Sequence, residues 1–137
     1  MQAFVADAAD APRRVVLDET PVRRDDLRLF HKTTLREPYE AAAARHPGAF
    51  DVLLRNEQGE LTEFTRGNLV LELDGRRVTP DLDGGLLDGC LRREWLERGE
   101  IVEATLTVDD LARATRIWFV NSLRGALLVS WERDDHG

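Results

Sequence analysis

Several residues and segments are scarce in this sequence, and each scarcity excludes a class of protein. One cysteine, Cys90, rules out a disulfide within the chain, which suits a reducing compartment. No apolar run is long enough to span a bilayer, and the first residues lack the apolar core of a secretory signal. The net charge of −7, with arginines scattered among acids, argues against nucleic acid and anionic membranes as partners. We therefore expect a cytoplasmic protein.

Lysine is the scarcest charged residue. Lys32 is the only lysine among 19 basic residues, and all the others are arginine. A guanidinium keeps its proton and cannot act as a nucleophilic amine, whereas a lysine amine can deprotonate and condense with a carbonyl. Lys32 is therefore a candidate catalytic residue. The alternative is a surface charge without a specific role.

The residues that are present fit one domain. The 137 residues are 42% hydrophobic and 33% charged, which provides enough apolar material for a core. We divide them into an arm (1–13), a domain (14–131) and a tail (132–137). Apolar periodicity and turn residues predict strands at 14–18, 52–54, 61–63, 68–73, 77–79, 100–106, 117–120 and 127–131. They predict helices at 34–46, 86–96 and 107–114. This mixture indicates an α/β (α+β) domain.

Two segments offer groups for a binding site. Residues 84–89 are rich in glycine and run into the helix predicted from residue 86, so we expect the amides from Leu87 to Leu91 to face an anion. A plain loop explains these glycines equally well. Glu63 lies in a predicted strand, where it is either a solvated side chain or a carboxylate that holds a protonated ring nitrogen.

Other chemistries are not supported. The histidines and Cys90 lack metal-ligand spacing, and we expect Cys90 to be a small buried residue rather than a nucleophile. The serines, including Ser122 at the end of a buried strand, have no nucleophile-elbow context. Metal and serine-hydrolase sites are therefore rejected.

Four motifs, taken in order, resemble those of the class IV aminotransferase family, the fold-type IV pyridoxal-phosphate enzymes. They are His31-Lys32-Thr33-Thr34, Leu61-Thr62-Glu63 with Asn68, Gly85-Leu86-Leu87-Asp88-Gly89 with Arg92, and Asn121-Ser122-Leu123-Arg124-Gly125. The resemblance runs from about residue 15 to about residue 129. It is nearest to the 4-amino-4-deoxychorismate lyases, particularly the lyase portion fused behind aminodeoxychorismate synthase.

The resemblance implies a fold and a cofactor. The fold would be a mixed, strongly curved sheet with two or three helices, the C-terminal cofactor-binding half of such an enzyme. Pyridoxal 5′-phosphate would be bound covalently by Lys32, which would also move protons. Glu63 would bond the pyridine nitrogen, and Leu87 would pack on the ring.

The resemblance also implies how the cofactor's phosphate is held. The backbone amides of Cys90 and Leu91 would bind it, with the Ser122 hydroxyl nearby. Asn121 and Arg124 would line the site.

The implied reaction converts 4-amino-4-deoxychorismate into 4-aminobenzoate and pyruvate, a step of folate biosynthesis. Family members carry an N-terminal domain before the lysine region, so we expect a partial chain. Its partners would be an N-terminal half or an aminodeoxychorismate synthase component, and a second copy in a homodimer. The alternatives are amino-acid transamination and a non-catalytic truncated relative that serves folding or dimerisation.

Overall fold

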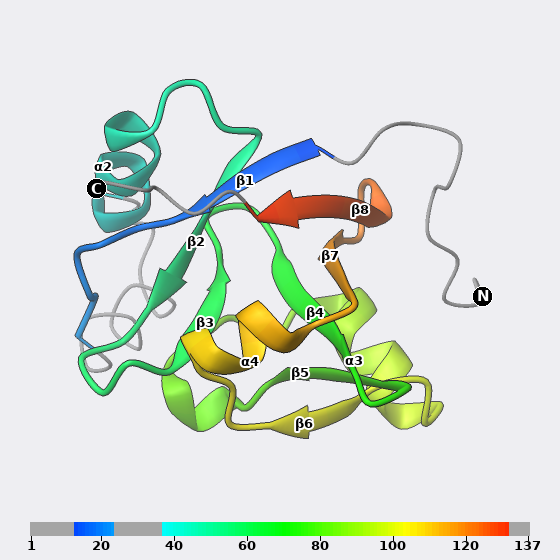
Figure 1. The fold of residues 1–137 in the computed structure, drawn as a ribbon. Coiled ribbons are helices and arrows are strands. Elements are labelled where there is room, and N and C mark those ends of the chain that lie inside the picture. The colour runs from blue at the N-terminus through cyan, green and yellow to red at the C-terminus, as the bar shows by residue number, and fades with distance from the viewer. Residues whose placement is uncertain (1–12, 24–36, 132–137) are drawn as a thin grey trace.

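A computed structural model describes residues 13–23 and 37–131, which form one eight-stranded sheet with three α-helices (Figure 1). The strands are β1 (Arg13–Leu17), β2 (Asp51–Arg55), β3 (Leu61–Phe64), β4 (Asn68–Leu73), β5 (Arg76–Pro80), β6 (Val102–Ala104), β7 (Arg116–Asn121) and β8 (Gly125–Trp131). The helices are α2 (Glu37–Arg45), α3 (Cys90–Glu97) and α4 (Val108–Arg113), with a 3-10 turn, η1 (Leu82–Gly84). Lys32 lies outside the described residues.

The sheet is mixed and curves back on itself. Its order is β3-β2-β1-β8-β7-β4-β5-β6, and an additional pairing of β3 with β4 closes the first six of these strands into a ring. β1 runs parallel to both β2 and β8, whereas β7 is antiparallel to β4 and β8. The predicted mixed, strongly curved sheet with two or three helices is confirmed.

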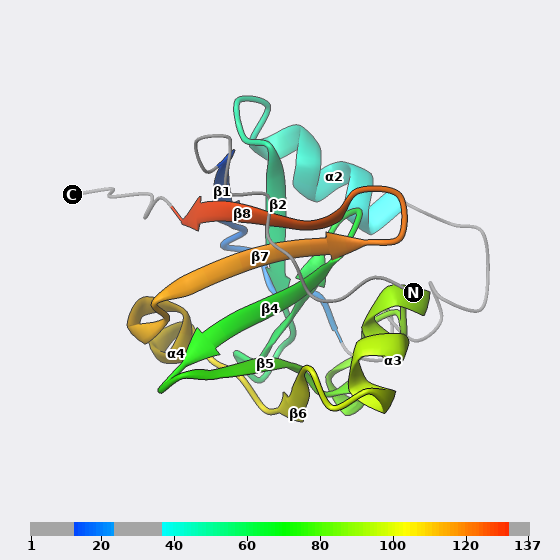
Figure 2. The same cartoon turned by 90° about the vertical axis from the view of Figure 1, so that its right-hand side faces the viewer.

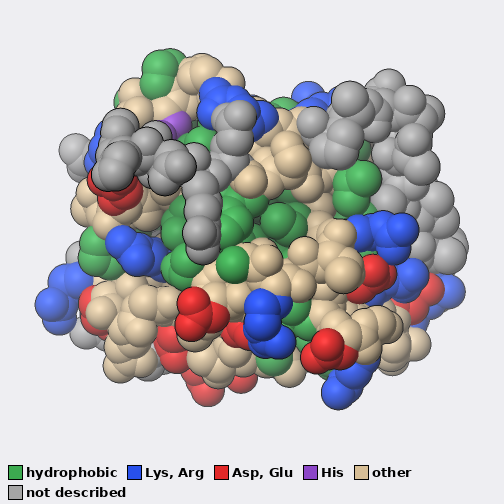
Figure 3. Space-filling view, viewed as in Figure 1, with side chains coloured by type: hydrophobic (Ala, Val, Ile, Leu, Met, Phe, Trp, Pro, Cys, Tyr) green, Lys and Arg blue, Asp and Glu red, His purple; other side chains and the backbone are tan. Residues whose placement is uncertain are grey.

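The strands of the ring are buried on both faces. Along β7, Ile117 and Phe119 belong to the core inside the ring, while Trp118 and Val120 pack beneath α3. The continuous apolar run in this segment indicated such burial. Figure 3 shows hydrophobic side chains gathered in the middle of the face seen in Figure 1, over the ring.

Two helices cover the outer surface of the ring. α2 packs Tyr39 and Ala42 against β1 and β2, and α3 packs Leu91 and Trp95 against β4 and β7. Figure 2 shows α2 and α3 on one side of the strands and α4 on the other. The region between α2 and α3 is where β3 presents Glu63. Among the described residues, no helix is both long and apolar enough to cross a membrane.

Two features predicted from neighbouring residues, a tight turn and a helix cap, are confirmed. Asp74 and Gly75 take φ values of 51° and 77°, and they form the tight turn between β4 and β5 that the pair predicts. Thr107 and Asp110 form the expected capping box at the start of α4.

Three expectations about residues 86–106 are wrong. The helix predicted over 86–96 begins only at Cys90, and Leu87 lies in the preceding loop with 52% of its surface exposed. Cys90 is exposed rather than buried, because it opens the helix on the solvent side. The strand predicted over 100–106 is shortened to Val102–Ala104, since it pairs only with β5 at the edge of the sheet.

Candidate functional site

Glu63 is a buried carboxylate between the two outer helices. It is 3% exposed, although it stands in a strand where a solvated side chain was one interpretation. The Tyr39 hydroxyl, from α2, donates a hydrogen bond to Oε2. The backbone N–H of Leu87, from the loop before α3, lies 3.3 Å from Oε1 and 3.4 Å from Oε2. A carboxylate removed from water requires such donors. Glu63 is therefore a buried, hydrogen-bonded carboxylate rather than a solvated surface charge.

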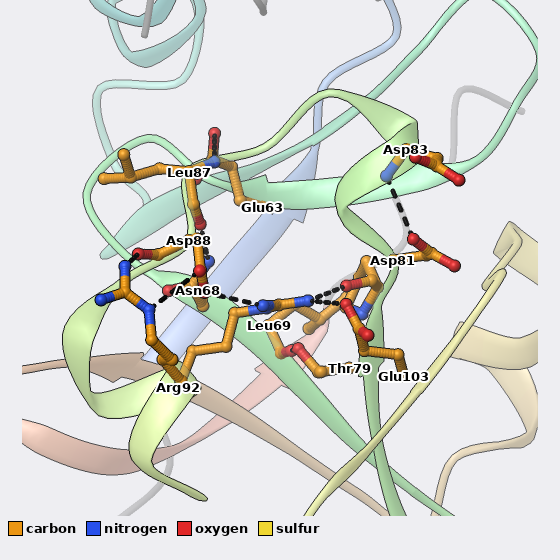
Figure 4. A network of polar contacts seen from close by, with 12 residues as sticks. Glu63, Asn68, Leu69, Thr79, Asp81, Asp83, Leu87, Asp88, Arg92 and Glu103 are labelled. Atoms are coloured by element: carbon orange, nitrogen blue, oxygen red, sulfur yellow. Dashed lines mark hydrogen bonds and ion pairs between the residues drawn. The ribbon is translucent and has the colours of Figure 1, made fainter. Parts of the chain in front are cut away.

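The loop that bears Leu87 is fixed by Asn68. Asn68 Nδ2 donates to the Leu87 carbonyl at 2.9 Å, and the Gly89 N–H donates to the same carbonyl at 3.1 Å. A Cβ on Gly89 would lie 2.4 Å from Asn68 Oδ1, so this close approach requires glycine. The loop thus holds the Leu87 N–H against Glu63 and leaves the Leu87 side chain largely exposed beside it (Figure 4).

The expectation that the amides from Leu87 to Leu91 are free to bind a ligand anion is wrong for two of them. The Leu87 and Gly89 amides form hydrogen bonds within the site and the loop. Cys90 and Leu91 stand instead at the start of α3, whose N-cap, Gly89, makes no side-chain capping bond. The first turn also holds no acidic residue. These two amides remain suited to an anion.

Arg92 ties the start of α3 to the edge of the sheet (Figure 4). Its guanidinium is 1% exposed and forms an ion pair with Asp88 at 2.9 Å and with Glu103 at 2.6 Å. Nη2 also donates to the carbonyl of Pro80 at 2.9 Å. A buried guanidinium with partners on three segments sets the position of the loop before α3.

Ser122 lies in the exposed turn between β7 and β8. In this turn the Arg124 N–H donates to Asn121 Oδ1 at 2.8 Å, and Asn121 Nδ2 donates to the Arg66 carbonyl at 3.1 Å. Val120, two residues before Ser122, pairs with Asn68 in the β4–β7 ladder. The turn that bears Ser122 therefore begins close to Asn68, the residue that holds the Leu87 loop.

The structure thus joins Glu63 and Leu87 by a hydrogen bond. Cys90 and Leu91 follow at the start of α3, directly after the loop that bears Leu87. The role assigned to Lys32 stays a prediction, since this residue lies outside the described part of the chain. Sequence reasoning missed Tyr39. A signal was available, because Tyr39 is the only tyrosine of the chain, just as Lys32 is its only lysine.

This arrangement suits a ligand that carries positive charge at one end and negative charge at the other. Glu63 offers carboxylate oxygens as acceptors for a protonated ring nitrogen, and the Tyr39 hydroxyl and the Leu87 N–H are uncharged donors to it. The Cys90 and Leu91 amides offer donors for a phosphate. The Leu87 side chain, in the loop before α3, is exposed and offers apolar surface.

Comparison with known families identifies the class. The amino-transferase class IV model matches residues 2–130, and the chain belongs to this family. Among solved structures, one from Mesorhizobium loti, provisionally named an amino-acid aminotransferase, is 37% identical with a TM-score of 0.84. The alignment covers 96% of this chain and 65% of that one.

Two relatives bear the name of a lyase. A Schizosaccharomyces pombe protein, provisionally named aminodeoxychorismate lyase, is 33% identical over 90% of this chain and 58% of its own length. The crystal structure of 4-amino-4-deoxychorismate lyase from Pseudomonas aeruginosa is 26% identical with a TM-score of 0.75. That alignment covers 91% of this chain and 48% of the other. The chain therefore spans about half the length of these lyase relatives.

Proposed function

We propose that this chain is the cofactor-binding part of a pyridoxal-phosphate-dependent lyase that converts 4-amino-4-deoxychorismate into 4-aminobenzoate and pyruvate. The observation that carries the proposal is the buried Glu63 carboxylate, held by Tyr39 and by the Leu87 amide and followed in space by an uncapped helix start. Membership of the class IV aminotransferase family and the named lyase relatives support the reaction.

The residues present fit the cofactor. When bound, pyridoxal phosphate supplies a conjugated ring that accepts the electron pair released as the substrate's bonds break. Glu63 would hold the proton on the ring nitrogen, and Leu87 would pack on the ring. The Cys90 and Leu91 amides and the Ser122 hydroxyl would bind the phosphate. Lys32 would bind the cofactor through its amine and move protons at the substrate.

Amino-acid transamination is the second candidate. It is favoured by the Mesorhizobium loti structure, which is at least as similar to this chain as the lyase relatives are. The two reactions differ in their needs, since a lyase releases pyruvate from one substrate, whereas a transaminase requires a 2-oxo acid to accept the amino group. Product analysis with and without an added 2-oxo acid separates them.

In this proposal, a part of the enzyme outside these 137 residues supplies the remainder of the site. The relatives extend well beyond the region that aligns with this chain. We propose an N-terminal half or an aminodeoxychorismate synthase component as partner, and a homodimer as the assembly. Sedimentation of the chain, alone and with a candidate half, tests both proposals.

The cofactor proposal is tested by titrating pyridoxal phosphate into the purified chain and following its visible absorbance. Glu63→Gln should weaken binding about ten- to a hundredfold, since a charge-assisted contact is lost. Lys32→Arg should abolish the absorbance change that reports covalent attachment. The matched control is Glu97→Gln, an exposed glutamate at the end of α3, which should bind as the unaltered chain does.

Two outcomes contradict the proposal. If neither Glu63 nor Lys32 affects cofactor binding, the site is wrongly placed. If the cofactor does not bind even with the candidate partner present, the non-catalytic module is the better description. Formation of 4-aminobenzoate by the reconstituted pair, lost in Lys32→Arg, would support the lyase.

A further inference from the structure

Asn68 stands opposite Glu63 in the sheet and reaches the loop before α3. The two residues are partners where β3 pairs with β4, and residues directly opposite in an antiparallel pair point to the same face. The Asn68 side chain is buried, and its Nδ2 donates to the Leu87 carbonyl at 2.9 Å (Figure 4). Asn68 therefore links the strand pair that bears Glu63 to the connection that leads into α3.

The same side chain contacts Gly89, the N-cap of α3. A Cβ on Gly89 would lie 2.4 Å from Asn68 Oδ1, so no side chain fits between the two residues. The Gly89 N–H donates to the same Leu87 carbonyl that Asn68 Nδ2 binds. Cys90 and Leu91, the first residues of α3, follow directly. One buried amide group thus fixes where α3 begins relative to the pair of β3 and β4.

Two groups at the ends of the proposed cofactor site meet at Asn68. Glu63, the acceptor for the ring nitrogen, is its partner across the strand pair. The Cys90 and Leu91 amides, the donors for the phosphate, follow the glycine that Asn68 contacts. When two binding groups are held in a fixed relation, a ligand that spans both binds more tightly than its separate parts, because the second contact forms at a high effective concentration. The relation between these two groups therefore affects the affinity of the whole cofactor.

We propose that Asn68 is a positioning residue, which sets the two ends of the cofactor site in register and so raises the affinity of a ligand that carries both a pyridine ring and a phosphate. It acts through the Leu87 carbonyl and through Gly89. Arg92 holds the same loop, but its bonds to Pro80 and Glu103 run to β5 and β6 rather than to β3. The inference rests on the proposed function, because it takes pyridoxal phosphate as the cofactor.

The test compares three ligands by calorimetry on the purified chain. Pyridoxine 5′-phosphate carries both ends, whereas pyridoxine and inorganic phosphate carry one each and are measured by their displacement of pyridoxine 5′-phosphate. None has an aldehyde, so covalent attachment to Lys32 does not enter. Asn68→Ser, which removes the amide group, should reduce the affinity for pyridoxine 5′-phosphate about tenfold and that for each single-ended ligand by less than about twofold. Asn68→Ala should show the same pattern.

The matched control is Asn56→Ser. Asn56 is also buried, and its Nδ2 donates to the Gly84 carbonyl at 3.1 Å, at the other end of the connection between β5 and α3. Both substitutions remove a buried hydrogen bond and should lower stability, so thermal unfolding of each variant sets a temperature at which it is folded. Asn56→Ser should bind all three ligands as the unaltered chain does. An equal loss of pyridoxine 5′-phosphate affinity in Asn56→Ser, or an equal loss of all three ligands in Asn68→Ser, would overturn the positioning role.

The same titrations separate this inference from the proposed function. If pyridoxine 5′-phosphate binds both Asn68 variants as tightly as the unaltered chain, the positioning role fails while the cofactor site stands. If none of the three ligands binds, even with the candidate N-terminal half present, the proposed function fails and the positioning role fails with it. A loss confined to pyridoxine 5′-phosphate, in a protein that forms neither 4-aminobenzoate nor a transamination product, would sustain the positioning role while the proposed reactions fail.

Discussion

Tyr39 donates a hydrogen bond to Glu63, and the chain's only tyrosine is thereby joined to a buried carboxylate 24 positions away. Tyr39 is 2% exposed and packs with Val16, Val52 and Leu54, so its ring is fixed by the contact of α2 with β1 and β2. The phenol is an uncharged donor. It orients the carboxylate and brings no positive charge to it.

Replacing Tyr39 with Phe keeps the packing and removes this donor. We expect the free energy of unfolding to fall by about 1–2 kcal/mol, because a buried carboxylate oxygen loses a hydrogen bond. Urea unfolding of the variant measures the change. The same substitution made in Glu63→Gln should cost less, and an equal cost in both backgrounds would show that the bond to Glu63 is not the cause.

Gly89→Ala should disturb the loop that bears Leu87. The new Cβ would meet Asn68 Oδ1 at 2.4 Å, and moving Asn68 would sacrifice its bond to the Leu87 carbonyl. Gly89 has a φ of −62°, so the cost is steric contact rather than backbone strain. We expect a loss of about 1–3 kcal/mol in unfolding free energy and weaker cofactor binding.

Gly84→Ala is the matched control for this loop. At that position the nearest atom to an added Cβ is 3.6 Å away, which is an ordinary contact. A second comparison is the double variant Gly89→Ala with Asn68→Ala, in which the clash is absent. If the double variant loses as much as the sum of the two single changes, then the contact between these residues is not what requires glycine.

Much of the fold could be predicted from the sequence because its signals are local. The Asp74-Gly75 turn and the capping box at Thr107 depend on neighbouring residues alone, and both are confirmed. The start of α3 could not be predicted in this way. Leu87 has helical spacing with Leu91, but its amide bonds Glu63 and its carbonyl bonds Asn68, so tertiary contacts hold it in a loop.

The candidate site could also be predicted only in part. Glu63 and Leu87 could be named because ordered motifs resemble those of a family. The burial of Glu63 could not be predicted, since a single carboxylate in a strand is usually solvated. The contacts of Arg13, Arg66 and Arg124 with the Phe50 ring could not be predicted either, because only folding brings these three segments together.

Arg92→Ala and Arg93→Ala should differ sharply in stability. Both arginines form an ion pair with Asp88, but Arg92 is 1% exposed whereas Arg93 is 54% exposed. Loss of Arg92 removes its bonds to the Pro80 carbonyl and Glu103 and leaves a cavity, so we expect a cost of about 2–4 kcal/mol. Arg93→Ala should cost less than about 0.5 kcal/mol. Urea unfolding of the two variants side by side measures this difference, and similar losses would contradict the anchoring role of Arg92.

The stability of the chain should depend on acid through Asp18. This carboxylate is 1% exposed and lies 2.5 Å from Arg45 Nη2 and 3.2 Å from His46 Nε2. Burial by itself raises the pKa of Asp18, but the hydrogen bonds and charges of Arg45 and His46 outweigh it and hold the pKa below 3.8. The charged form is therefore favoured more in the folded than in the unfolded chain.

The sign of the pH dependence follows from this lowered pKa. A carboxyl group whose folded pKa is depressed stabilises the fold fully above its unfolded pKa, and the contribution is lost as the pH falls through the folded value. Asp18→Asn should thus cost about 1–3 kcal/mol at neutral pH, and the difference should shrink below pH 3.8. Urea unfolding of both proteins across this range measures it. Arg45→Gln should cost stability in the unaltered chain but little in Asp18→Asn. A gap between the two proteins that persists unchanged into strong acid would show that the Asp18 charge is not its source.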